Sequence, residues 1–236
     1  RQRQMCIRDR TWNANTACIR VSKARSRRRL PPPDLRKINY KAGNVKQQIS
    51  SVVRSCLRNY KCSSYGEFRT LLELFNVSVE ERTGTVDGRD YAGVIYGAMT
   101  DDGYGIGTPF KSSRIGKDVG YKALQKYYER SKSALKQDGT LDRLRQTVKD
   151  AMSPDNTREE FRQLLKADGI DVVFRINPVG RIYGVTFIDH NAGIVANGSV
   201  LGKEFSANVF DELYPTLKEE RRDYLLPKRT TTFRTE

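Results

Sequence analysis

The chain has 236 residues, enough for one large or two small domains that each bury a hydrophobic core. Its mean hydropathy of −0.67 and 30% charged residues predict a soluble protein, and no apolar run approaches the ~20 residues that a membrane span requires. The net charge of +15 favours an acidic partner such as nucleic acid, provided that the charge lies on the folded body.

Most of the positive charge lies near the N-terminus. Residues 1–30 carry ten Lys and Arg against Asp9 alone, and residues 31–60 carry six against Asp34 alone, which leaves a net charge of +1 for residues 61–236. Basic runs of this kind are usually solvated. We therefore expect residues 1–36 to form a disordered basic arm that attracts phosphates without sequence preference.

A second interpretation of the arm is that it is not native. The first residue is not Met, and Met5-Cys6-Ile7-Arg8-Asp9-Arg10 looks like the translation of sequencing-adaptor DNA, in which case the chain is a fragment. The cysteines at 6, 18, 56 and 62 lack the spacing of a zinc site or a disulfide framework. We expect free thiols in a reducing cytoplasm, with no metal and no cofactor.

Apolar residues at three- and four-residue intervals predict a first helix from Val45 to Leu57. A second helix begins at Ser64-Tyr65-Gly66-Glu67, which fits the capping box S/T-x-x-E/Q. Strands are predicted over 77–81 and 91–99, with a hairpin signal at Asp87-Gly88.

A strand-to-helix junction follows over 111–117. It places hydroxyl groups beside basic side chains, and its candidate phosphate-binding residues are Lys111, Ser112, Ser113, Arg114 and Lys117. Helix N-termini bind anions, so such a junction is suited to a phosphate. The alternative is that these residues merely cap a helix that starts near Lys117.

The segment 121–136 is predicted to be an amphipathic basic helix. Lys122, Lys126 and Arg130 recur every four residues on one side, opposite the apolar Leu124 and Tyr128. Residues 111–136 carry eight basic groups against Asp118 and Glu129. This region is our candidate for contacts with DNA phosphates, and an ordinary solvated helix face is the alternative.

The pattern of the first part then recurs about ninety residues later. A capping box at Thr157-Arg158-Glu159-Glu160 opens a helix, strands are predicted over 170–176 and 181–189, and a junction follows at 197–203. Its candidate phosphate-binding residues are Ser199 and Lys203, with Asn197 and Ser206 beside them. Two copies are too few for a solenoid, so the pattern indicates a duplicated α+β unit.

The second copy is also the most recognisable part of the chain. Its segments 169–175, 180–191 and 197–206, which include Gly180-Arg181-Ile182-Tyr183-Gly184 and Asn197-Gly198-Ser199, closely resemble the C-terminal part of relaxase/mobilisation nuclease proteins. The resemblance covers about residues 37–214. These proteins belong to bacterial conjugative and mobilisable elements.

The resemblance implies a parent enzyme that nicks one DNA strand at a transfer origin. In that family a tyrosine attacks the phosphodiester and a histidine cluster holds a divalent metal, which makes the phosphorus more electrophilic. This chain contains His190 alone, so it carries no histidine cluster, and we transfer no catalytic residue to it. Whether the chain is itself an enzyme stays open.

Other candidate chemistry has weak support in the sequence. Asp189-His190-Asn191 is compatible with general acid–base catalysis but also with an ordinary turn. Gly103-Tyr104-Gly105-Ile106-Gly107 lacks the spacing of a phosphate-binding loop, and a β-turn is the better interpretation.

Taken together, the sequence predicts an α+β fold of two related helix–helix–β-sheet units joined by a basic helical linker, with disordered termini. The predicted segments are a basic arm (1–36), a first unit (37–119), a linking helix (120–139), a second unit (140–214) and a tail (215–236). We expect a cytoplasmic, non-catalytic accessory region of a relaxase that assists DNA binding or assembly at an origin of transfer, with backbone contacts to DNA and no membrane partner. The alternative is a module that binds other mobilisation or conjugation proteins without direct DNA contact.

Overall fold

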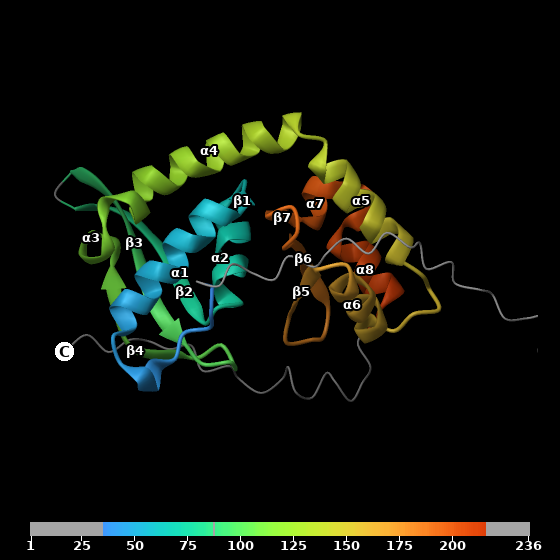
Figure 1. The fold of residues 1–236 in the computed structure, drawn as a ribbon, viewed down its shortest axis with the longest axis horizontal. Coiled ribbons are helices and arrows are strands. Elements are labelled where there is room, and N and C mark those ends of the chain that lie inside the picture. The colour runs from blue at the N-terminus through green and yellow to red at the C-terminus, as the bar shows by residue number, and fades with distance from the viewer. Residues whose placement is uncertain (1–34, 87, 216–236) are drawn as a thin grey trace, which may run out of the picture.

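The computed structural model describes residues 35–86 and 88–215. They form eight α-helices and two β-sheets, which makes the fold α+β (Figure 1). The predicted arm and tail lie outside these residues except for positions 35, 36 and 215, and Leu35 is buried. No helix of the described residues is long and apolar enough to cross a membrane.

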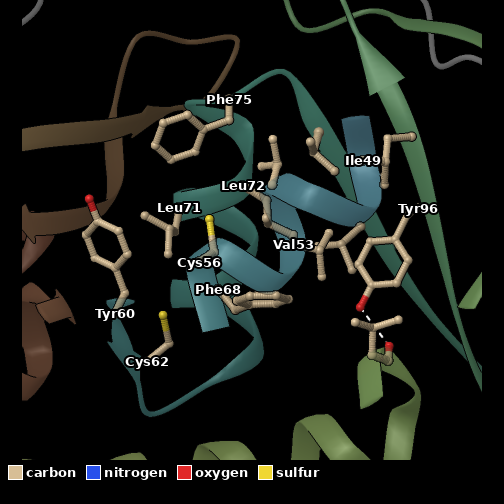
Figure 2. Close-up of a cluster of buried hydrophobic side chains, with 14 of the residues drawn as sticks. Ile49, Val53, Cys56, Tyr60, Cys62, Phe68, Leu71, Leu72, Phe75 and Tyr96 are labelled. Atoms are coloured by element: carbon tan, nitrogen blue, oxygen red, sulfur yellow. Dashed lines mark hydrogen bonds between the residues drawn. The ribbon is translucent and has the colours of Figure 1, made fainter. Parts of the chain in front are cut away.

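The first two helices form where the apolar spacing and the capping-box sequence, respectively, predict them. Helix α1 spans Val45–Asn59 and buries Ile49, Val52, Val53 and Cys56 on one face. Helix α2 spans Tyr65–Glu73, and the Ser64 hydroxyl accepts a hydrogen bond from the Glu67 amide at 3.4 Å. The buried apolar side chains of α1 and α2 pack with β-strand side chains in the cluster that Figure 2 shows.

The capping box is complete at only one of its two predicted positions. Helix α6, Arg158–Ala167, has both reciprocal bonds between Thr157 and Glu160. At α2 the buried Glu67 carboxylate instead accepts hydrogen bonds from the Ser63 amide at 2.6 Å and the Asn197 amide at 3.2 Å. Burial raises the pKa of Glu67, and this side chain links α2 to the second sheet.

The first sheet is an antiparallel meander of β2 (Val77–Val86), β3 (Arg89–Met99) and β4 (Gly105–Lys111). Of the predicted turn at Asp87-Gly88, Asp87 lies outside the described residues. Strand β4 was not predicted because its two glycines and Pro109 are residues that are rare in strands. A proline is tolerated there because β4 lies at the edge of the sheet.

The second sheet combines distant parts of the chain. Its order is β1-β7-β6-β5, where β5 is Ile170–Ile176, β6 is Ile182–Asp189 and β7 is Ile194–Asn197. Strand β1, Lys61–Cys62, pairs in parallel with β7, so a segment from the predicted first unit belongs to this sheet. Ile188 and Val195 of the second sheet also pack in the same core as α1 and α2.

The remaining helices complete two series of the described residues, which have the same order of elements apart from a 3-10 turn (Tyr40–Ala42) and β1 in the first. The first series continues after β4 with α3 (Ser112–Ile115), a 3-10 turn (Lys117–Val119) and α4 (Tyr121–Gln137). The second begins with α5 (Thr140–Ala151) and α6 and, after β7, continues with α7 (Gly198–Leu201), a 3-10 turn (Lys203–Phe205) and α8 (Ala207–Leu213). In Figure 1, α4 runs along one edge of the molecule from the first sheet towards α5.

Gly193 allows the close approach on which β1 depends. Its φ is +66°, and a Cβ there would lie 2.3 Å from the Asn59 carbonyl oxygen, while its own carbonyl accepts a bond from the Lys61 amide at 2.8 Å. We expect Gly193→Ala to lower the free energy of unfolding by about 3 kcal/mol, measured by urea denaturation with circular dichroism.

Gly66→Ala is the matched control for this experiment. Gly66 lies in α2 with open space around its Cα, so alanine should stabilise the protein by about 0.5–1 kcal/mol. Equal stability of the two variants would contradict the role assigned to Gly193.

Candidate functional site: a basic groove between α1 and α4

A groove with a volume of about 580 Å³ lies between α1 and α4. Its walls carry several cationic side chains and one carboxylate. The lining residues are Ser51, Arg54, Leu57, Arg58, Asp118, Ala123, Lys126, Tyr127 and Arg130. Two of the residues predicted to contact phosphates, Lys126 and Arg130, therefore lie in this groove together with two arginines of α1.

The periodicity of α4 places its cations on the exposed side. Lys122, Lys126 and Arg130 are exposed, while Leu124 and Tyr128 are buried in the first core. Four residues make slightly more than one helical turn, so the three cations form a row along α4. Lys126 and Arg130 line the groove, whereas Lys122 lines a separate hollow one turn earlier.

Tyr127 fixes α4 against the end of α1. Its hydroxyl donates a hydrogen bond to the Tyr60 carbonyl at 2.7 Å and accepts one from the Cys62 amide at 3.1 Å. Burial raises the pKa of Tyr127 far above its ordinary value, so the hydroxyl stays protonated. The wall that carries Lys126 and Arg130 is therefore held in a defined position relative to α1.

Arg54 is occupied by contacts within the protein. Its Nε donates to Asp118 Oδ2 at 2.7 Å and its Nη2 to Asp118 Oδ1 at 3.1 Å, and it also contacts the Ile115 carbonyl and Ser50. The hydrogen bond from Arg54 lowers the pKa of Asp118. This bidentate pair neutralises the one carboxylate that lines the groove.

Three cations of the groove remain for a ligand. Arg58, Lys126 and Arg130 form no ion pair with any acidic side chain among residues 35–86 and 88–215. Arg54 and Arg58 were missed at the sequence level because their charge was counted with the N-terminal excess. Their spacing of four residues on the polar side of α1 was the available signal.

The two predicted junctions do not come together. Lys111, Ser113, Arg114 and Lys117 are exposed and Ser112 is half-buried, all beside the start of α4. Ser199 and Lys203 are exposed on α7 and the turn after it, and Figure 1 shows α3 and α7 well apart.

The capping alternative, in which the junction residues cap helices that start near Lys117 and Ser206, agrees with the structure in position at Ser206 but without a side-chain hydrogen bond. Neither α4 nor α8 has a side-chain cap hydrogen bond, although Ser206 occupies the N-cap position of α8. Ser199 instead lines a polar cleft of about 440 Å³ with Arg175 and Tyr183. Arg175 already pairs with Glu73 at 2.9 Å.

His190 lies in a chain of hydrogen bonds between α1 and the second sheet. Its Nε2 is 3.0 Å from an Asp171 carboxylate oxygen, which can only accept, so Nε2 carries the proton. Nδ1 then accepts a hydrogen bond from the Tyr60 hydroxyl at 2.6 Å. Asp189 accepts bonds from the Asn191 and Ala192 amides and shapes the turn that was the alternative interpretation.

The cysteines and the acidic groups form no metal site in the described part of the chain. Cys56 and Cys62 are free thiols, as predicted, and both are buried, whereas Cys6 and Cys18 lie outside the described residues. Burial raises the pKa of both described thiols. Within residues 35–86 and 88–215, no group of three His, Cys, Asp or Glu side chains is arranged to hold a metal ion.

Comparison with protein-family models, with curated proteins and with solved structures finds no match to this chain.

The chain of hydrogen bonds at His190 predicts a specific dependence of stability on pH. The bond from His190 lowers the pKa of Asp171, so this carboxylate contributes stability above its ordinary pKa and loses it as the pH falls through the lowered value. We expect Asp171→Asn to lower the free energy of unfolding by about 1 kcal/mol at neutral pH. This difference from the unchanged protein should shrink between about pH 5 and pH 2.

Urea denaturation across this pH range measures the difference in the free energy of unfolding between the unchanged protein and Asp171→Asn. Asp102→Asn, which changes an exposed carboxylate outside the His190 chain of hydrogen bonds, is the control and should leave stability unchanged at every pH. If Asp171→Asn lowers the free energy of unfolding by the same amount down to the lowest pH, the stabilising role given to the Asp171–His190 bond is contradicted.

Proposed function

We propose that this chain is a C-terminal accessory region of a relaxase or mobilisation protein, and that it binds DNA through phosphate contacts along α4 and in the groove between α1 and α4. The observation that carries the proposal is the convergence of Arg58, Lys126 and Arg130 on one groove without an acidic partner among the described residues. In this role the protein would act in the cytoplasm and would need no catalytic residue of its own.

The dimensions of the basic row suit a nucleic-acid backbone. Lys122 and Arg130 are eight residues apart in one helix, which corresponds to about 12 Å along its axis. Duplex DNA carries roughly seven phosphate charges over that length. Lysine and arginine side chains that contact phosphates position a protein on DNA without reading its sequence, so we propose non-specific backbone contacts.

We also propose that the two series of elements are related units and that α4 is the basic helix that joins them. The matching order of elements supports this relation, and so does the backbone of the two glycines that end α3 and α7. Gly116 has φ and ψ of 165° and 161°, and Gly202 has 157° and 169°. The proposed unit boundaries at residues 119 and 139 set α4 apart as the joining helix, although α8 takes the corresponding place in the second series, and β1 crosses into the second sheet.

A protein-binding role is the second candidate, and exposed apolar side chains favour it. Leu164, Tyr183 and Val200 are exposed on elements of the second series, and Val179 is exposed in the turn between β5 and β6. Such residues suit contacts with other mobilisation or conjugation proteins. Salt separates the two candidates, because DNA affinity falls steeply with salt when several phosphates are neutralised.

The basic row gives the main test of DNA binding. Changing Lys122, Lys126 and Arg130 together to Gln should lower the affinity of the full chain for duplex DNA by roughly tenfold to hundredfold. The slope of the logarithm of the binding constant against the logarithm of the salt concentration should become shallower by about 3. Fluorescence anisotropy with a labelled duplex at several salt concentrations measures both quantities.

The matched control for the basic row removes three exposed charges elsewhere, by changing Arg143, Lys149 and Lys166 to Gln. Both triple variants keep the same N-terminal arm and the same net charge. Equal losses in the two variants would show that net charge alone attracts the DNA, and unchanged binding in the first would refute the contact surface.

Asp118 offers a test in the opposite direction. Its carboxylate lines the groove and pairs with Arg54, so Asp118→Asn raises the net charge of the groove by one and leaves the Arg54 cation without its carboxylate partner. We expect the affinity for duplex DNA to rise by roughly threefold at low salt, in the same anisotropy assay. Asp155→Asn makes the same charge change at an exposed site outside the groove and should have a smaller effect.

A further inference from the structure

The polar cleft of about 440 Å³ lies where strand β7 ends, between α2, the second sheet and the first residues of α8. Its volume is within the range of small-molecule sites. Thr70 of α2, Arg175 and Asn197 of the second sheet, and Asn208 of α8 are among its lining residues. Of the described residues that line the cleft, Arg175 is the one charged side chain, and none carries a carboxylate.

The register of the second sheet places the lining residues of its strands on one face. Gly184 of β6 pairs with Arg175 of β5, and Thr186 of β6 pairs with Asn197 of β7. Positions 184 and 186 are two apart in one strand, so they point to the same face. Helix α2 covers this face, because Arg175 Nη2 donates a hydrogen bond to the Thr70 hydroxyl at 2.8 Å.

The first residues of α8 close the cleft at the edge of β6. Strand β7 pairs with only the second half of β6. A Cβ at Gly198 would lie 1.9 Å from the Phe205 carbonyl oxygen and 3.7 Å from the Val185 carbonyl oxygen, so the chain after β7 turns back against this edge. Helix α8 follows directly, which brings Ser206 and Asn208 to the cleft beside the sheet.

Arg175 belongs to a cluster with a net positive charge. Its Nη2 lies 2.9 Å from Glu73 Oε2, and Glu73 Oε1 accepts a hydrogen bond from Arg69 Nε at 2.8 Å. Two guanidinium groups therefore share one carboxylate. Glu67 lies on the same helix, but it is buried and its oxygens accept bonds from amide and hydroxyl donors of the protein. An anionic group in the cleft is attracted by the cluster.

The hydrogen-bonding groups of the cleft that remain for a ligand are mainly donors. Asn208 Oδ1 accepts a bond from Arg181 Nη2 at 3.0 Å, and Asn197 Oδ1 accepts one from the Thr186 hydroxyl at 2.9 Å. Each of these two amides therefore retains its NH2 group. The Arg175 side chain bonds to other described residues through Nη2, which leaves Nε and Nη1. Such nitrogen donors match a ligand rich in acceptors, as an oxyanion is.

We propose that this cleft binds a phosphate group through Arg175 and the side-chain amides of Asn197 and Asn208. The three donors come from β5, β7 and α8, and a tetrahedral group accepts bonds from more directions than a planar carboxylate does. The phosphate belongs either to a small phosphorylated molecule or to a nucleic-acid strand. The inference does not rest on the proposed function, because the cleft and the groove between α1 and α4 share none of their described lining residues.

Calorimetric titration of the full chain tests the assignment. The probes are ribose 5-phosphate, ribose, succinate and a short unpaired deoxythymidylate strand without terminal phosphates. Asn208→Asp keeps the oxygen that accepts from Arg181 and replaces the amide donor by a negatively charged oxygen. We expect this change to weaken binding of a phosphate probe roughly tenfold or more. Arg175→Gln should weaken it as well, with circular dichroism to check the fold.

Gln163→Glu is the matched control for Asn208→Asp. It makes the same change of charge at an exposed position of α6 that does not line the cleft. The N-terminal arm is the same in both variants, so its attraction for anions is common to them. We expect Gln163→Glu to leave binding of the phosphate probes unchanged.

The choice of probe distinguishes the two sources of the phosphate. Saturable binding of ribose 5-phosphate that Asn208→Asp weakens supports a small phosphorylated molecule, and the same loss for the strand alone supports a nucleic-acid phosphate. Ribose or succinate binding as tightly as ribose 5-phosphate would overturn the proposal. It would also be overturned if Asn208→Asp affected both phosphate probes no more than Gln163→Glu does.

A further variant separates this inference from the proposed function. Changing Lys126 and Arg130 to Gln alters the groove between α1 and α4 and leaves the cleft intact, so binding of ribose 5-phosphate should not change. If that variant keeps full duplex affinity, the proposed function fails, while a loss of phosphate binding in Asn208→Asp still supports the cleft. If duplex affinity falls but Asn208→Asp has no effect on either phosphate probe, the cleft fails alone.

Discussion

The segment from Tyr60 to Cys62 is the connection on which the rest of the structure depends. The Lys61 amide bonds to Gly193, and Lys61 and Cys62 pair in parallel with Ile194 and Val195. The Tyr60 side chain reaches His190, and Tyr127 of α4 bonds to the backbone of both Tyr60 and Cys62. Three residues therefore join α1, α4 and the second sheet, because their backbone and side-chain groups bond to α4 and to the second sheet directly after α1 ends.

This connection explains why a helix surface becomes a groove. Without a fixed partner, Lys126 and Arg130 would be an ordinary solvated row on α4, which was the alternative interpretation of the sequence. The bonds of Tyr127 set α4 beside the end of α1, so Arg58 faces the same space as those two cations. The Arg54–Asp118 pair joins α1 to the turn before α4 at a second point, and the groove is held from both ends.

The sequence predicted those elements whose patterns are local. Apolar spacing located α1 and α4 closely, and the capping box located the start of α6. Strand β1 has only two residues, too few for any periodicity, and its partner β7 lies in a distant part of the chain. For the same reason Lys126 and Arg130 were predicted as candidates while Arg58 was not, since only the tertiary contact between two helices brings it to them. The bond between His190 and Tyr60 likewise leaves no local signal.

The contact between Tyr60 and His190 has a consequence for how the chain acquires its structure. The two residues are 130 positions apart, and a ribosome needs roughly 7–26 s to synthesise that length. During this interval α1 and α2 have been made but the strand that must pair with β1 has not. Closing so long a loop is slow. The apolar face formed by Cys62 and its neighbours therefore stays open to solvent or to a chaperone until the last strand emerges.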